Sequence, residues 1–115
     1  MALTITSRVS GDTVVLDLEG RLWVLDLPLR ERVRALLDQG YRFYVFNLER
    51  VDYVDSSGLG QLVALWSSVR MRDGNFCILR PSVRVQRLLK VTRLNVIFDI
   101  FEDEEKAKIS VRRGA

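Results

Sequence analysis

A chain of 115 residues is long enough for one ordinary domain and too short for two. Hydrophobic residues make up 48% of it and charged residues 29%, which are globular values and exclude a disordered chain. The formal net charge of +3 is modest, and no aromatic residues interleave with the basic run from Arg80 to Arg93, so nucleic acid is not expected as a partner.

The side-chain inventory also excludes several kinds of chemistry. The chain has no histidine, so it cannot build a Ser-His-Asp or Cys-His catalytic site, and a zinc site is implausible. Its single cysteine, Cys77, forms no internal disulfide and is expected in the core. There is no nucleotide-binding glycine loop, signal peptide or apolar run of transmembrane length. We therefore expect a cytoplasmic protein that is not an enzyme, inserts into no membrane, and needs no metal or cofactor.

The first part of the chain predicts a β-hairpin followed by a helix. Residues 3–9 and 13–19 alternate apolar and polar side chains around a turn at residues 10–12, and Gly20 is expected to end the hairpin. Asp26 can cap the helix, Pro28 suits its first turn, and Gly40 suits its C-terminal stop. The predicted apolar stripe of this helix consists of Leu29, Val33, Leu36 and Leu37.

The middle of the chain predicts a right-handed βαβ unit. Residues 43–48 form an unbroken aromatic and β-branched run, as in a strand covered on both faces, and residues 75–79 form a second strand. Between them a helix is expected from Ser57 to about Arg70. Its predicted apolar stripe consists of Leu59, Leu62, Val63, Trp66 and Val69, although an outward Trp66 would belong to a partner surface.

The last part predicts a helix capped by Ser82, a strand over residues 97–101, and a terminal helix that begins in the acidic run 102–105. Val85, Leu88 and Leu89 should face inward in the first of these helices. Its basic residues are interpreted as a solvated face in preference to a weak phosphate-attracting one. Residues 111–115 are expected to fray. The predicted fold is one α/β domain over residues 1–115, with a mixed sheet of about five strands and helices mainly on one face.

A small polar turn joins the middle strand to the middle helix. Asp55, Ser56 and Ser57 are residue types that cap a helix N-terminus. Gly58 and Gly60 weaken the first helical turn by roughly 1 kcal/mol each relative to alanine, which indicates a backbone that something approaches closely. The plain structural interpretation is that the serines cap the helix and the glycines ease the turn.

The hexapeptide of residues 55–60, with Asn47 and Leu48 upstream and an apolar helix downstream, closely resembles the signature of the STAS domain, specifically of bacterial anti-sigma factor antagonists. The resemblance extends from Leu3 to about Ile100. It implies that a partner kinase phosphorylates Ser56, with Ser57 as the second choice, and that Asp55 and Ser57 shape the loop. The implied loop and partner-binding set is Asp55, Ser57, Gly58, Leu59, Gly60 and Trp23.

One segment departs from the family pattern. Relatives often carry Gly-Glu-Leu-Asp or Gly-Arg-Leu-Asp after the second strand, and the aspartate is associated with the phosphorylation site, whereas this chain has Trp23 at that position. Asp26 is the nearest aspartate downstream. Trp23 could be a permanent interface anchor, since tryptophan is enriched at binding hot spots, or equally a partly buried core residue.

The resemblance implies a binding switch. The unmodified protein would bind an anti-sigma factor that is also a serine kinase and so release a sigma factor, phosphorylated Ser56 would abolish binding, and a serine phosphatase would reset the switch. A weak homodimer is compatible with it. The alternative keeps the fold and makes the chain a constitutive interaction subunit of a stress-signalling scaffold or of a membrane lipid transporter. An enzyme acting on a small ligand ranks below both.

Overall fold

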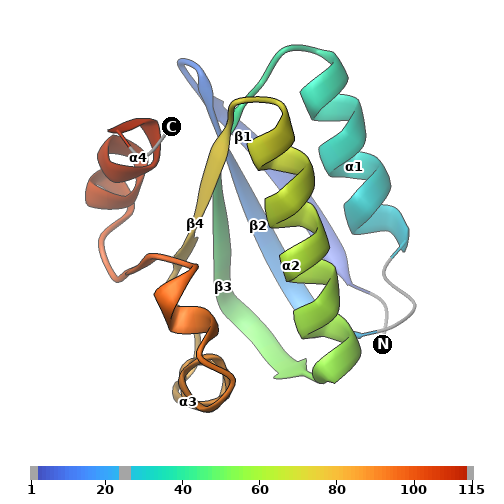
Figure 1. Ribbon diagram of the computed structural model, residues 1–115, viewed down its shortest axis with the longest axis vertical. Helices are drawn as coiled ribbons and strands as arrows, with labels where there is room; N and C mark the ends of the chain where they lie inside the picture. Colours follow the sequence, from blue (N-terminus) through green and yellow to red (C-terminus); the bar gives the residue numbers. More distant parts are fainter. Residues whose placement is uncertain (1–2, 24–26, 114–115) are drawn as a thin grey trace.

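A mixed five-stranded sheet forms the centre of the molecule, and its strands are ordered as in the chain (Figure 1). The computed structural model describes residues 3–23 and 27–113, without the side chain of Leu27. β1 and β2 are antiparallel, and the other neighbours are parallel, so the predicted α/β fold is confirmed. The strands are β1 (Thr4–Ser10), β2 (Thr13–Leu22), β3 (Phe43–Val54), β4 (Asn75–Leu79) and β5 (Ile100–Phe101). The helices are α1 (Leu27–Asp38), α2 (Ser56–Met71), α3 (Val83–Val91) and α4 (Glu104–Arg113), with a 3-10 turn, η1 (Leu94–Val96).

The hairpin is confirmed, but it does not end at Gly20. β2 continues to Leu22 because β3 continues beside it, and Leu22 pairs with Val54 in the parallel register. The register shifts between Gly20 and Arg21, where the positive φ of 116° at Gly20 is readily adopted only by glycine. The prediction failed because the end of a parallel strand is set by its partner, which is distant in the sequence.

Tight turns precede the parallel strands β2, β3 and β4, and these turns all lie at the same end of the sheet. Gly11 (φ 63°) precedes β2 and Gly40 (φ 98°) precedes β3, and no heavy atom outside their chain neighbours lies within 4 Å of where a Cβ would stand. Gly74 precedes β4 and packs on the carbonyl group of Arg42. Gly40 ends α1 as predicted, and its N–H donates to the carbonyl oxygen of Leu37 at 3.0 Å. These turns lie at the opposite end from the start of α2 (Figure 1).

The larger core lies between the sheet and the helices α1, α2 and α3. The predicted stripe of α1 is buried throughout, and Ser82 caps α3, whose Val85 and Leu89 are buried while Leu88 is partly buried. In α2 the stripe is partly wrong. Val63 is 37% exposed, whereas Leu65 is buried, because positions 58, 62, 65 and 69 follow one line along the helix. Trp66 packs partly buried against this core, with the Arg70 guanidinium carbon 5.9 Å from its ring centroid.

The second face of the sheet is covered by α4, which lies across the sheet from α1 and α2 (Figure 1). Cys77 is buried there as predicted, with its Sγ 3.6 Å from the carbonyl oxygen of Ala107, and burial raises the pKa of this thiol to about 12. Beyond α4 this face is polar. Arg8 on β1 bridges Asp17 on β2 (Nε to Oδ2, 2.6 Å) and Glu104 on α4 (Nη2 to Oε1, 2.8 Å). This bridge ties the first strand to the last helix.

Two predictions near the C-terminus differ from the structure. Only Ile100 and Phe101 of the expected strand 97–101 are extended, because Phe98 turns into the core and its ring stacks on that of Phe76 with centroids 5.2 Å apart. The tail expected to fray from residue 111 is helical as far as Arg113, and Val111 is buried on the side of α4 that packs against the sheet. Residues 114–115 lie outside the described residues.

Candidate functional site

The predicted site lies where β3 passes into α2. Asp55 is the N-cap of α2, and its Oδ1 accepts a hydrogen bond from the N–H of Gly58 at 2.8 Å. Its carbonyl oxygen accepts a second one from the N–H of Leu59 at 3.0 Å. The helix therefore begins at Ser56, one residue before the predicted start. Capping is done by Asp55, which leaves both serines as the first two residues of the helix.

The serine hydroxyl groups occupy a position suited to modification. Ser56 and Ser57 are both exposed, and Asp55 is partly exposed. The first turn of α2 contains no acidic residue, so within that turn nothing but the capping carboxylate of Asp55 offsets the positive end of the helix dipole behind the serines. An added anion on the first turn would meet this positive potential and backbone N–H groups that face outward.

The glycines of the turn have different environments. Gly58 is buried, and a Cβ built on it would overlap the carbonyl oxygen of Leu22, at the end of β2, and lie 3.2 Å from Cγ1 of Val54. The close approach inferred from the sequence is therefore that of the chain's own backbone. Gly60 is exposed, with no neighbouring atom within 4 Å of where a Cβ would stand, and Leu59 belongs to the hydrophobic core. Of the predicted loop and partner-binding set, only Ser57 and Gly60 are exposed, as is Ser56 itself.

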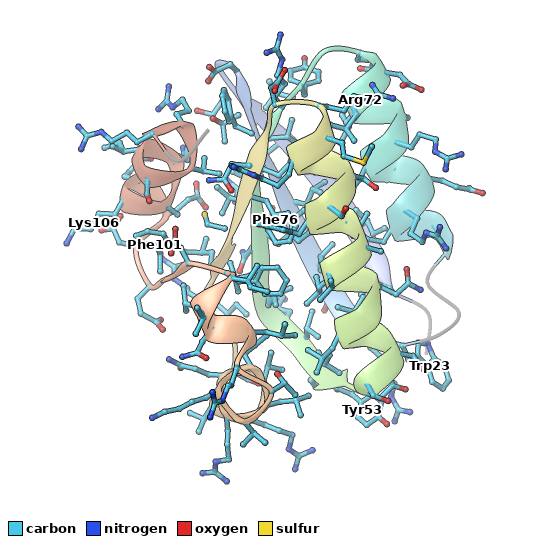
Figure 2. All side chains as sticks on the ribbon, in the orientation of Figure 1. Trp23, Tyr53, Arg72, Phe76, Phe101 and Lys106 are labelled. Atoms are coloured by element: carbon cyan, nitrogen blue, oxygen red, sulfur yellow. The ribbon has the colours of Figure 1, made fainter. Side chains whose placement is uncertain are left out.

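Trp23 lies in a small cluster of aromatic rings and a cation next to the turn. The guanidinium carbon of Arg21 lies 5.9 Å from the ring centroid of Trp23 and 5.5 Å from that of Tyr53. Figure 2 shows Trp23 and Tyr53 beside the first turn of α2. Trp23 is partly buried, and Tyr53 is 38% exposed.

Sequence reasoning missed Arg21 and Tyr53. The two residues are neighbours because the register of β2 and β3 pairs Arg21 with Tyr53. No local motif indicates this contact, and only the full length of the β2–β3 pairing could have predicted it. Asp26, a candidate both for the helix cap and for the aspartate nearest to the turn, lies outside the described residues.

The described part of the chain contains neither a candidate metal site nor a candidate membrane-spanning helix. The acidic and cysteine side chains of residues 3–23 and 27–113 form no group of three or more that could hold a metal ion. Within the same residues, none of the helices combines the length and apolar character needed to cross a bilayer.

Known proteins resemble this chain over nearly its whole length. Residues 4–107 match the family model of the STAS domain. The anti-sigma-B factor antagonist of Staphylococcus aureus is 31% identical over 106 residues, which covers 91% of this chain and 98% of that protein.

Solved structures of one protein give the same fold. The anti-sigma factor antagonist SpoIIAA in its unphosphorylated form is 27% identical, with a TM-score of 0.77 over 99% of this chain and 98% of that one. The phosphorylated form of SpoIIAA, from Bacillus, is 23% identical by structural alignment, with a TM-score of 0.70 over 99% of this chain and 100% of that one, and supports the fold alone.

Proposed function

This chain belongs to the STAS domain family, and on that premise we propose that it is an anti-sigma factor antagonist whose binding is controlled by phosphorylation of Ser56. Unmodified, it binds an anti-sigma factor that is also a serine kinase, and a sigma factor is released. The names of its relatives support the antagonist role, and the structure of SpoIIAA that is 27% identical to this chain is described as an unphosphorylated form.

The observation that carries the proposal is the exposure of Ser56 at the first position of α2, on a turn fixed by Asp55 and Gly58. A kinase can reach this hydroxyl without unfolding the helix. Phosphorylation adds a charge of about −1.5 to −2, and the start of a helix favours an anion, so the modified domain stays folded. Ser57 is also exposed and is the second choice.

The phosphate then lowers the affinity at the interface with the partner protein. A partner surface that fits a neutral hydroxyl would have to desolvate a dianion beside the carboxylate of Asp55. Changing a mostly bound population into a mostly free one needs about a 10⁴-fold loss of affinity, or roughly 5.5 kcal/mol. An unpaired charge buried at an interface costs energy of this order.

The chain acts in this scheme as the substrate of a kinase and not as an enzyme. ATP and magnesium belong to the partner kinase, and a serine phosphatase restores the hydroxyl. Because the kinase and its ATP are cytoplasmic, the switch works in the cytoplasm. Trp23 and Tyr53, whose rings both lie near the Arg21 guanidinium group, provide apolar contact area next to the serine.

The test is a pull-down from an extract of the native host with the wild-type chain and with Ser56→Ala and Ser56→Asp as baits. Ser57→Asp is the matched control, since it places the same charge one residue further along the same exposed turn. We expect wild-type and Ser56→Ala to retain an ATP-dependent kinase that Ser56→Asp loses. Incubation of the recovered kinase with ATP should phosphorylate wild-type but not Ser56→Ala.

Retention of the same protein by every bait would contradict the switch and favour the constitutive interaction subunit. In that case Trp23→Ala distinguishes a permanent anchor from a packing residue, because only an anchor would lose the partner while the fold remains intact. Loss of the kinase with Ser57→Asp but not with Ser56→Asp would move the switch to Ser57.

A further inference from the structure

A groove lies between α1 and α2, well away from the serine turn. The two helices lie side by side on the same face of the sheet and run in the same direction (Figure 1). The groove has a volume of about 260 Å³, and its floor is formed by the buried side chains of Val33, Leu37 and Leu65. It extends along α1 from residue 30 to residue 37, about 10 Å at 1.5 Å per residue. The groove therefore runs along the helices and is apolar at its base.

Positive charge borders this apolar floor. Arg30 and Arg34 are exposed, four residues apart on α1, and both line the groove. Like charges at this spacing repel one another on a helix, and neither arginine forms an ion pair with a carboxylate in residues 3–23 or 27–113. At the far end, Arg72 is paired with Asp38 at 3.0 Å (Figure 2 labels Arg72). Within these residues, Arg30 and Arg34 thus remain as two cations for an anion that enters over them.

Met71 supplies the remaining feature. It lines the groove and is 83% exposed, although methionine is an apolar side chain with an adaptable shape. A flexible thioether at this place can fold over a bound apolar chain. An α-helix, about 10–12 Å across, does not fit a groove of this volume, which favours a small ligand over a helix of a partner protein.

We propose that this groove binds an amphipathic organic anion, with its charged head between Arg30 and Arg34 and an unbranched apolar tail along α2 toward Met71. The lined stretch of α1 is about 10 Å long, which is about the length of an extended octanoate ion, so we expect a tail of that size. The head is a carboxylate or a phosphate monoester, since the guanidinium group binds both. This inference is independent of the proposed function, because the groove contains none of the serine-turn residues.

The test is a titration of the full chain, followed by NMR chemical shifts, with butanoate, hexanoate, octanoate, dodecanoate, octyl phosphate and neutral octanol. We expect saturable shifts of groove residues, an affinity that rises by up to about fourfold per methylene as far as octanoate, and a plateau beyond it. Octanol should bind at least about tenfold more weakly than octanoate. The tighter of octanoate and octyl phosphate identifies the head group.

Substitutions locate the ligand. Arg30→Gln with Arg34→Gln should weaken octanoate at least about tenfold and leave the helix intact, because glutamine is a good helix former. The matched control is Arg32→Gln on the same helix, which should bind as the wild type does, since Arg32 donates to the hydroxyl of Ser7 at 2.9 Å and does not line the groove. Ala64→Trp should fill the groove and abolish binding. Absence of saturable shifts in the millimolar range, equal binding of octanol, or an unchanged affinity in the double variant would each overturn the proposal.

Discussion

Replacing Gly58 by alanine is expected to destabilise the fold, whereas the same replacement at Gly60 is expected to stabilise it. Both residues lie in the first turns of α2, where alanine is favoured over glycine by about 0.5–1 kcal/mol. At Gly60 no atom outside its chain neighbours and the nearby backbone of α2 lies within 4 Å of the added methyl group, so this gain is realised in full. At Gly58 the methyl group overlaps the carbonyl oxygen of Leu22 and lies 2.8 Å from its carbonyl carbon, so backbone must move.

The cost at Gly58 follows from what has to move. The obstructing atoms belong to the paired end of β2, and Cγ1 of Val54 on β3 stands 3.2 Å away on the same side. Overpacking of this kind costs about 1–3 kcal/mol, and because paired backbone has to move we expect about 2–3 kcal/mol here. After a gain of about 1 kcal/mol in helix propensity, a net loss of about 1–2 kcal/mol remains. For a domain of this size that corresponds to a fall in Tm of about 3–8 °C.

The assay is urea unfolding followed by tryptophan fluorescence and circular dichroism, with wild type, Gly58→Ala and Gly60→Ala compared side by side. Opposite shifts of the midpoint at constant slope are the expected result. If Gly58→Ala were as stable as the wild type, or if both variants shifted in the same direction, the packing of α2 on the end of β2 would not be the reason for a glycine at this position.

Three further predictions concern other parts of the structure. Asp55→Ala removes the cap of α2 and should cost about 1 kcal/mol in urea unfolding, with Asp55→Asn recovering most of it. Cys77, whose pKa is raised to about 12 by burial, should not react with a thiol reagent at pH 8 in the native state but should react in urea. The Arg8 guanidinium group holds the pKa values of Asp17 and Glu104 below their usual range, so the stability from this bridge is present above about pH 4 and is lost as the pH falls through the lowered folded-state values. Because these side chains are partly exposed, Arg8→Gln should cost only about 1–2 kcal/mol at pH 7, and the difference from the wild type should shrink steadily toward pH 3.

Local patterns predicted the elements well, because their causes are local. Gly40 ends α1 through its own backbone conformation, and Ser82 caps α3 through a hydrogen bond to a residue three positions later. The predictions that failed depended on distant parts of the chain. β2 passes Gly20 because β3 accompanies it, and most of residues 97–101 are not extended because Phe98 stacks on Phe76.

The residues of the candidate site also divide into those that a local pattern identifies and those that depend on distant parts of the chain. The serine turn was found from residue types and spacing, which are properties of a short segment. The reason for Gly58 could not be found in this way, since the obstructing carbonyl group is that of Leu22. The grouping of Arg21 with Tyr53 likewise requires the strand register, and the bridge from Arg8 to Glu104 joins residues 96 positions apart.

The placement of the glycine turns has a practical consequence. The turns at Gly11 and Gly40 precede β2 and β3 and lie at the end of the sheet opposite Ser56 (Figure 1). The space beside both glycines is free. β2, with 10 residues, separates the two ends by about 30 Å. A fluorophore or a short peptide tag introduced at the Gly11 turn would therefore stay clear of a partner that binds at Ser56, as we propose. Such a labelled chain would serve as a biosensor for binding and release in real time, with the label at the Gly11 turn and the proposed binding site at the other end of the domain.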